Sequence, residues 1–165
     1  MHVRLATPAD AAVVADVLSA AAAKLREAGN ELWSTAEVSE LAVSRHVDEG
    51  LYHLGFLGAE PVGVFRLQSE DPHFWPEIAP GTSLYLHKLA VIPSRQGQGL
   101  ANLLLGHAVG LTHARGCRFL RLDCMGGRPK LRAVYEQFGF RHHSQKVLGG
   151  HPFERFEFDV GAPDA

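Results

Sequence analysis

Helical and alternating patterns of apolar residues divide the chain into a nearly continuous series of elements. In the first helical pattern the apolar positions are Val13, Val14, Val17, Leu18, Ala21 and Leu25. Thr7-Pro8-Ala9-Asp10 precedes it with a capping hydroxyl, a proline and an acid, and Gly29 follows it, so we predict a helix between them. A capping box, Ser34-Thr35-Ala36-Glu37, predicts a second helix whose first apolar positions are Val38, Leu41 and Ala42.

The remaining patterns predict strands and two further helices. The predicted strands cover residues 3–6, 51–57, 62–67, 82–92, 118–123 and 153–160. The further helices cover residues 100–114 and 129–138, and Gly139 closes the second of them. The predicted order is β-α-α-β-β-β-α-β-α-β-β, in which one further strand lies between Gly139 and residue 153. This order predicts an α+β or mixed α/β sandwich around one sheet.

Composition narrows the class of protein. A chain of 165 residues is typical of one domain, here residues 1–165, which buries about 70% of its unfolded surface. Its 16 basic and 18 acidic residues give a net charge of -2, which argues against a nucleic-acid partner. No apolar run approaches the ~20 residues of a membrane span, and the first residues lack a secretory signal, so we expect a cytoplasmic protein.

Cysteine and histidine usage adds little chemistry. Cys117 and Cys124 are an odd number of residues apart beside a predicted strand, so they point to opposite faces and we expect reduced thiols. The ten histidines are scattered, and His142 and His143 are adjacent and therefore point apart. No metal-ligand spacing occurs, so we expect no metal site.

Residues 69–81 contain three prolines and predict a loop. Phe74 and Trp75 in this loop are either hydrophobic plugs or part of a substrate lid. Trp33, Phe74, Trp75 and the loop acid Glu77 are candidates to contact a substrate, although the three aromatic residues could equally be packing.

The turn between residues 92 and 100 carries the strongest chemical signal. Gly97 and Gly99 lie between the longest predicted strand and a helix, where successive N–H groups and the helix N-terminus favour a phosphate or pyrophosphate. No Gly-Lys-Ser/Thr follows, which excludes a Walker loop. The pattern Gly97-x-Gly99-x-x-Asn102 lacks the third glycine of a dinucleotide fingerprint, but Asp123 ends the next strand where a ribose-binding acid belongs, so an oxidoreductase remains an alternative.

Gln96-Gly97-Gln98-Gly99-Leu100-Ala101 resembles the Gln/Arg-x-x-Gly-x-Gly/Ala signature of the GNAT superfamily of acetyl-CoA-dependent N-acetyltransferases. The segment 89–93 before it is similar to the family's strand into the pyrophosphate loop, and residues 131–140 are similar to its tyrosine-containing helix ending in Gly-Phe. The resemblance covers nearly the whole chain. It implies an acyl-CoA N-acyltransferase fold with helices on both faces of a mostly antiparallel sheet that contains one splayed parallel strand pair.

The resemblance also implies how acetyl-CoA would bind. The backbone of Leu89, Ala90 and Val91 would pair with pantetheine, and an N–H near Leu89 or Ala90 would polarise the thioester carbonyl. The remaining binding positions are Gln96, Gly97, Gln98, Gly99, Leu100, Ala101 and Asn102. Arg128 stands where the family often has Asn, so Arg128 or Lys130 would reach the cofactor instead, or that contact is missing.

By the same resemblance, an acceptor amine attacks directly and Tyr135 is the general acid that protonates the departing thiolate. Apolar spacing alone makes Tyr135 a core residue, so both roles stay open. Some family members have a carboxylate base where Tyr85 stands. The best base here is His87, which two-residue periodicity places on one strand face with Tyr85, Leu89 and Val91 and which has a suitable ordinary pKa. A tyrosine-bound water or Glu77 are the other candidates.

The leading prediction is therefore an N-acetyltransferase that acts on a primary amine of a small molecule or peptide. The alternatives are a non-catalytic acyl-CoA-binding sensor and the dinucleotide-binding oxidoreductase. The near-neutral charge gives no indication of the acceptor. A homodimer through the last strands is compatible with the fold.

Overall fold

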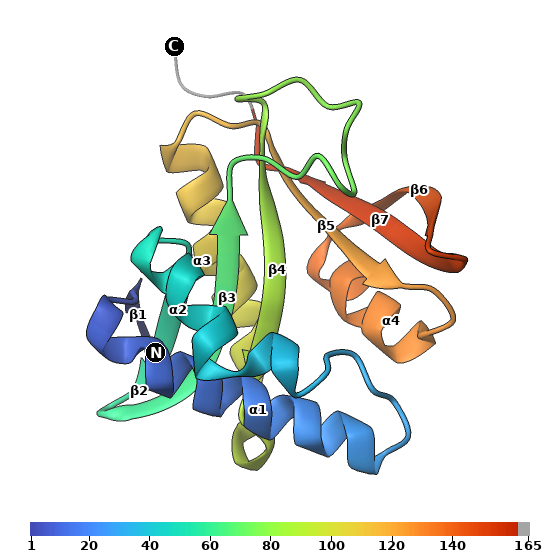
Figure 1. The fold of residues 1–165 in the computed structure, drawn as a ribbon. Coiled ribbons are helices and arrows are strands. Elements are labelled where there is room, and N and C mark those ends of the chain that lie inside the picture. Colours follow the sequence, from blue (N-terminus) through green and yellow to red (C-terminus); the bar gives the residue numbers. More distant parts are fainter. Residues whose placement is uncertain (162–165) are drawn as a thin grey trace. The chain divides into compact units, whose positions relative to one another are not determined.

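The computed structural model describes residues 1–161, which contain four α-helices and seven strands. The helices are α1 (Ala11–Glu27), α2 (Glu40–Asp48), α3 (Leu100–Ala114) and α4 (Pro129–Phe138). The strands are β1 (His2–Leu5), β2 (Tyr52–Leu57), β3 (Glu60–Gln68), β4 (Ser83–Val91), β5 (Phe119–Met125), β6 (Arg141–Leu148) and β7 (His151–Asp159). Figure 1 shows these elements in the predicted order. No helix within residues 1–161 is long and apolar enough to cross a membrane.

The strands follow the order β1-β2-β3-β4-β5-β7-β6. One parallel pair interrupts an otherwise antiparallel pattern: residues Ser83–Leu86 of β4 pair with Phe119–Leu122 of β5. The pairs β1–β2, β2–β3, β5–β7 and β6–β7 are antiparallel. The predicted α+β fold with one parallel strand pair is confirmed.

The chain divides into two compact units, and boundaries between them fall inside β4 and α3. Unit 1 comprises Met1–Leu67 and Lys88–Leu104, and unit 2 comprises Gln68–His87 and the chain from Leu105 onward. The boundary in β4 falls between His87 and Lys88, and the boundary in α3 between Leu104 and Leu105. Each unit is described below by itself.

In unit 1, α1 and α2 lie side by side, and their buried faces belong to one core with β2 and β3 (Figure 1). The predicted stripe of α1 is largely confirmed, since Val14, Val17, Leu18 and Ala21 are buried. The predicted start of this helix is confirmed only in part. The Asp10 carboxylate accepts hydrogen bonds from the N–H and hydroxyl of Thr7, and Pro8–Asp10 form a 3-10 turn before α1.

The predicted start of the second helix is wrong. Ser34 and Glu37 do form a capping box, but it caps a three-residue 3-10 turn, Ala36–Val38. The helix α2 begins only at Glu40, after a new N-cap in which the Ser39 hydroxyl accepts the Ala42 N–H. This interruption leaves Leu41 89% exposed instead of buried, while Val43 and Val47 fill the core.

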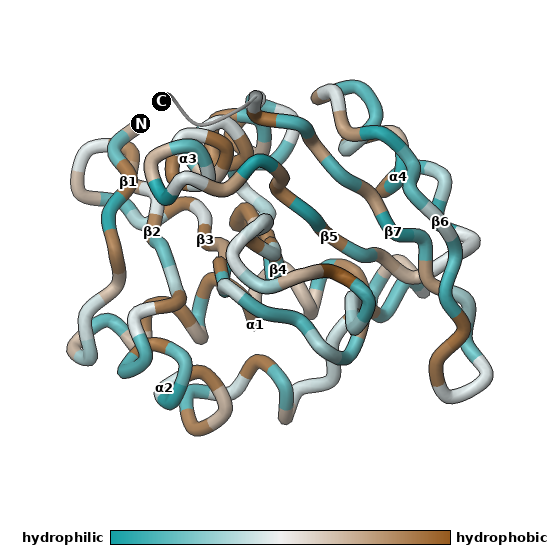
Figure 2. Tube along the Cα trace, turned by 90° about the horizontal axis from the view of Figure 1, so that it is seen from above, coloured by the Kyte–Doolittle hydropathy of each residue, from teal (hydrophilic) through white to brown (hydrophobic). Residues whose placement is uncertain are grey.

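In unit 2, β7 pairs with β5 on one side and β6 on the other. β5 buries Leu120 and Leu122. Figure 2 shows β6 mostly in the hydrophilic colour, in agreement with its largely exposed residues. Residues 69–81 form no helix or strand, as their prolines predict.

Candidate functional site

In unit 1, the turn before α3 has the backbone that the two glycines predict. Gly97 and Gly99 both have φ 76°, a left-handed conformation that favours glycine. A Cβ added to either glycine would meet no atom within 4 Å. The turn therefore needs glycine for its backbone angles, and it borders open space where the N-terminal N–H groups of α3 begin.

Side chains fasten this turn to the strands of unit 1. The Gln96 side-chain amide donates a hydrogen bond to the Val91 carbonyl oxygen at 3.1 Å. Arg95 forms an ion pair with Glu60 at 2.5 Å. Gln96 thus supports the turn with its side chain, which leaves its backbone as the part that can face a ligand. Among the other predicted binding positions, Leu100 is buried, Ala101 is half-buried, and Gln98 and Asn102 are exposed.

The end of β4 presents its backbone to two sides. The Ala90 carbonyl lies toward β3, because a Cβ on Gly63 would come within 3.0 Å of it. The Ile92 N–H also points toward β3, where it donates to the Val62 carbonyl. Since the polar groups of successive strand residues point to opposite sides, those of Leu89 and Val91 point away from β3. Sequence reasoning grouped these three residues and did not separate Ala90 from its neighbours.

Lys88 interrupts the regular alternation of β4. It is the one residue other than glycine with a positive φ, 53°, within residues 1–161. The expectation that Tyr85, His87, Leu89 and Val91 share one face requires extended backbone throughout, and Lys88 departs from it. No sequence signal predicts this conformation, which lysine rarely adopts.

The Lys88 side chain packs inside unit 1 beside the predicted substrate residue Trp33. Its ammonium lies 4.8 Å from the centre of the Trp33 ring and 3.5 Å from a Glu37 carboxylate oxygen. Burial lowers the pKa of Lys88, although Glu37 opposes this effect. One face of Trp33 is therefore covered by a cation of the protein itself.

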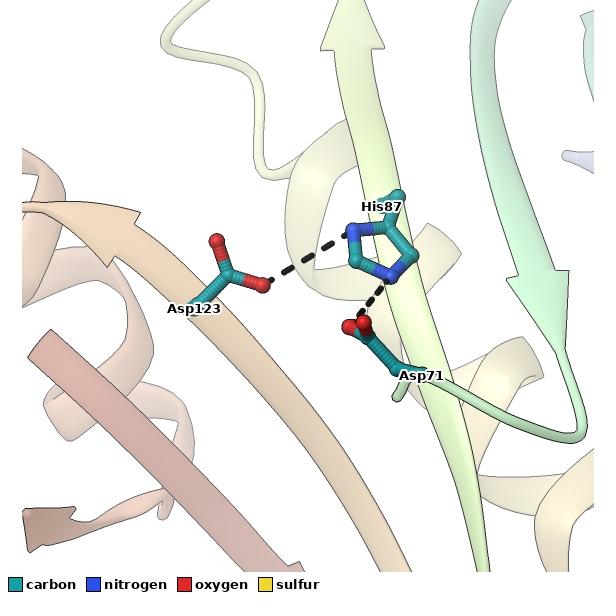
Figure 3. Close-up of side chains that lie close together, drawn as sticks. All are labelled: Asp71, His87 and Asp123. Atoms are coloured by element: carbon teal, nitrogen blue, oxygen red, sulfur yellow. Dashed lines mark ion pairs between the residues drawn. The ribbon is translucent and has the colours of Figure 1, made fainter. Parts of the chain in front are cut away.

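In unit 2, His87 lies between two carboxylates (Figure 3). Its Nε2 is 3.1 Å from Asp71 Oδ2, and its Nδ1 is 3.8 Å from Asp123 Oδ1. Burial raises the pKa of Asp71, but the contact with His87 and the hydrogen bond from the Phe74 N–H outweigh it, and the net pKa is lowered. Sequence reasoning found His87 but missed Asp71, which comes from the proline-rich loop, and considered Asp123 only as a ribose ligand.

Tyr135 of α4 is both a core residue and part of this charged region of unit 2. Its ring packs against Phe140 and Phe156, at centroid distances of 5.8 and 6.2 Å. Burial raises the pKa of the phenol, and the nearby Cys124 and Asp123 raise it further. The Tyr135 hydroxyl therefore holds its proton at neutral pH. Packing and proton donation are compatible roles for this residue.

The other tyrosine proposed for the site, Tyr85, is buried, and burial raises the pKa of its phenol. Cys117 and Cys124 are free and buried. Burial raises the pKa of the Cys124 thiol to about 12, so it stays protonated and unreactive near neutral pH.

Residues of the loop 69–81 are engaged within unit 2. Trp75 is only 2% exposed, with the guanidinium carbons of Arg155 and Arg121 at 4.7 and 5.4 Å from its ring centres. Glu77 forms an ion pair with Arg155 at 2.6 Å, and the Phe74 ring packs against Phe153 at 5.0 Å. Of the two predicted roles, the structure favours packing for Trp75, and the Arg155 contact makes Glu77 a poor base.

Arg128 lies at the N-cap of α4, where its guanidinium is 3.6 Å from the Met125 sulfur. With Arg132, Cys124 and Glu154 it lines a cleft of about 200 Å³ in unit 2. Two guanidinium groups at one cleft are compatible with an anionic ligand there.

Comparisons with known proteins identify the family. Residues 18–140 match the family model described as acetyltransferase (GNAT) family. The chain is 28% identical over 154 residues to the uncharacterized N-acetyltransferase YesJ of Bacillus subtilis strain 168, which covers 88% of this chain and 84% of that protein.

Solved structures show the same fold. A GNAT-family acetyltransferase from Listeria monocytogenes 4b F2365 has a TM-score of 0.81 at 22% identity and covers 96% of this chain and 94% of its own. The putative acetyltransferase yncA of Salmonella typhimurium, solved with its cofactor acetyl-CoA, has a TM-score of 0.72 at 16% identity and covers 100% and 98%. The family match extends over most of the chain and includes the glycine turn, β4 and α4: this protein belongs to the acetyltransferase (GNAT) family and is an acyltransferase.

Proposed function

We propose that the protein transfers an acetyl group from acetyl-CoA to a primary amine of a small molecule or peptide, by direct attack of the amine. The observation that carries this proposal is the turn at Gly97 and Gly99, whose left-handed backbone borders open space at the start of α3. Backbone N–H groups at a helix N-terminus bind pyrophosphate without basic side chains, which fits the weak overall charge. Acetyl-CoA supplies an activated thioester.

The backbone of β4 supports a more specific binding mode. Pantetheine carries amide groups that can pair with an exposed strand edge. Leu89 and Val91 direct their polar groups away from β3, but the Val91 carbonyl already accepts the Gln96 amide. We therefore assign pantetheine pairing to the N–H and carbonyl of Leu89 and to the Val91 N–H, and we leave Ala90 out of this role.

Two side chains of unit 2 handle protons in this proposal. His87 accepts the proton that the attacking amine loses, and the Tyr135 hydroxyl donates a proton to the departing thiolate sulfur. The raised pKa of Tyr135 keeps the phenol protonated at neutral pH, so its proton is available to the sulfur as the carbon–sulfur bond breaks.

Two measurements test the function. A thermal shift with acetyl-CoA and CoA, compared with NAD, measures cofactor choice, and we expect stabilisation by the first two alone. Free-thiol release from acetyl-CoA across a panel of primary amines measures transfer. Binding without thiol release for any amine would favour a non-catalytic acyl-CoA sensor, and stabilisation by NAD alone would contradict the proposal.

A pair of glycine variants tests the turn itself. Gly99→Ala and Gly58→Ala each place a Cβ at a positive φ with no atom nearby, so each should lose about 1–2 kcal/mol of stability. We expect only Gly99→Ala to weaken acetyl-CoA binding, measured by calorimetry below the melting temperature of both variants. Equal affinities in the two variants would remove the turn from the binding site.

A further inference from the structure

The cluster of Asp71, His87 and Asp123 brings together three segments of unit 2: the loop before β4, β4 itself and β5. The His87 ring lies between the carboxylates, and each ring nitrogen faces a different one (Figure 3). Asp71 is almost fully buried, with 4% of its side chain exposed, and the side chains of His87 and Asp123 are 14% and 10% exposed. The cluster is thus mostly shielded from water.

On one side of the ring, His87 Nε2 and Asp71 Oδ2 form a buried pair. Within residues 1–161, the buried atoms His87 Nε2 and Asp71 Oδ2 have no hydrogen-bond partner apart from each other. Their separation of 3.1 Å makes each the polar atom that can satisfy the other. Asp71 itself is held in place, because its Oδ1 accepts the Phe74 N–H at 3.0 Å.

This pairing selects one form of the neutral imidazole. A carboxylate oxygen can only accept, so the Nε2 that faces Asp71 carries the hydrogen, and Nδ1 then has a lone pair. A lone pair on Nδ1 and an oxygen of Asp123, 3.8 Å apart, are two acceptors side by side. A protonated amine, which has three donors, fits such a pair of acceptors.

The charge of the cluster favours the same kind of ligand. Two carboxylates around one imidazole are net negative in either protonation state of the ring. The ionisable groups of unit 2 that interact with them include Tyr85, His73, Tyr135 and Cys124. Burial and Asp123 raise the pKa of the Cys124 thiol, which stays neutral. Tyr85 and Tyr135 both have raised pKa values and stay neutral. A cation is therefore attracted strongly at this low-dielectric position.

The three residues also offer ligand atoms within 4.8 Å of one another, close enough to consider a metal ion. A metal ion binds one ring nitrogen, however, and here the two carboxylates face opposite nitrogens of the same ring. The imidazole itself occupies the space between the carboxylates. The geometry thus fits an aspartate-histidine-aspartate arrangement better than a chelate.

We propose that Asp71 and Asp123 are positioning residues for His87: Asp71 holds Nε2–H so that Nδ1 accepts the proton, and Asp123 binds the ammonium group of a cationic amine acceptor. The proton passes from the acceptor nitrogen to Nδ1. The broken N–H bond leaves its electron pair on the amine, and the positive charge moves to the imidazolium between two carboxylates. This inference rests on the proposed acetyl transfer for its purpose, but the arrangement of the ring can be measured without it.

Nitrogen NMR of the ligand-free protein tests the arrangement directly. The His87→Gln variant assigns the ¹⁵N signals of the His87 ring. We follow these signals as the pH is raised until the imidazole is neutral, where their shifts distinguish a protonated from an unprotonated nitrogen. We expect protonated Nε2 in the wild type and in the neighbouring exposed control Glu70→Gln, and a mixture of the two forms in Asp71→Asn. Protonated Nδ1 in the wild type, or an unchanged spectrum in Asp71→Asn, overturns the proposal.

The same spectra test the competing ligand. On addition of Zn²⁺ we expect the His87 ring signals to stay in place. A zinc-dependent shift of one ring nitrogen that disappears in Asp123→Asn would identify a metal site and overturn the ammonium assignment.

Kinetics then separate the two carboxylates. The probes are the most active alkylamine of the thiol-release panel and its fluorinated analogue, which is neutral at the assay pH. We expect Asp71→Asn to lower kcat by about 10²-fold or more with the alkylamine, but much less with the neutral analogue, at unchanged KM for acetyl-CoA. Asp123→Asn should raise KM for the alkylamine only. Equal losses with both amines would indicate a merely structural role, whereas thiol release from neither amine would count against the proposed function and leave the NMR result standing.

Discussion

At the scale of single residues, chemistry and packing coincide. Tyr135 belongs to an aromatic cluster with Phe140 and Phe156, and yet its hydroxyl is influenced by Asp123, which also lies beside His87. Both proton-transfer candidates of the sequence prediction, His87 and Tyr135, therefore interact with Asp123, which the prediction considered only as a ribose ligand. Removal of a hydroxyl is the change that separates the two roles of Tyr135.

We expect Tyr135→Phe to lower kcat by about 10²–10⁴-fold while the affinity for acetyl-CoA is unchanged. The ring contacts that hold α4 remain in the variant, and only the proton donor is lost. Steady-state thiol release and calorimetry measure the two quantities. Tyr52→Phe is the control, since Tyr52 is also buried but lies in the core of unit 1. An unchanged kcat in Tyr135→Phe would exclude the general-acid role.

At the scale of elements, capping and stop residues in the sequence predict where a helix begins and ends, provided that no second capping residue competes with the first. The predicted ranges 100–114 and 129–138 agree with α3 and α4. The start of α2 was mispredicted because Ser34 and Ser39 both offer capping hydroxyls, and the structure uses both in succession. The first helix has one start signal, at Thr7 and Asp10, and Arg4 strengthens it.

This start signal predicts a pH-dependent contribution to stability. Hydrogen bonds from Arg4 lower the pKa of Asp10 well below its usual range. A carboxyl with a lowered pKa in the folded state stabilises the protein above its unfolded pKa, near 4, and this contribution disappears as the pH falls through the folded value. We expect Asp10→Asn to lose about 1 kcal/mol at pH 7 and less at acidic pH.

Urea unfolding of the two proteins at several pH values measures this difference. The exposed Asp16→Asn on α1 is the control and should match the wild type throughout. A difference between Asp10→Asn and wild type that stays constant from neutral to acidic pH would show that the ionised carboxylate is not the stabilising group.

At the scale of the whole molecule, the order of elements and the family were predictable, because both depend on motifs contiguous in sequence. The turn at Gly97 and Gly99 is such a motif. The cluster around His87 was not predictable, because its acids come from separate segments that only folding brings together. The left-handed backbone at Lys88 was also missed, since local preference opposes it. The sequence left open whether Trp75 is a hydrophobic plug or part of a lid. The positions of Arg121 and Arg155 over its ring, which only the structure shows, favour packing.

Each of the two tryptophans has a cation over its ring, and each belongs to a different unit: Trp33 beside Lys88 in unit 1, and Trp75 between arginines in unit 2. Their fluorescence therefore reports on the two halves of the chain separately. If residues 1–165 form one cooperative domain, the emission change of Trp33→Phe and that of Trp75→Phe should each coincide with the loss of circular dichroism in the same variant during urea unfolding. Emission that changes at a lower urea concentration than the dichroism in either variant would mean that the unit with the remaining tryptophan unfolds on its own. With one tryptophan in each unit, the protein thus contains two optical probes for cooperativity.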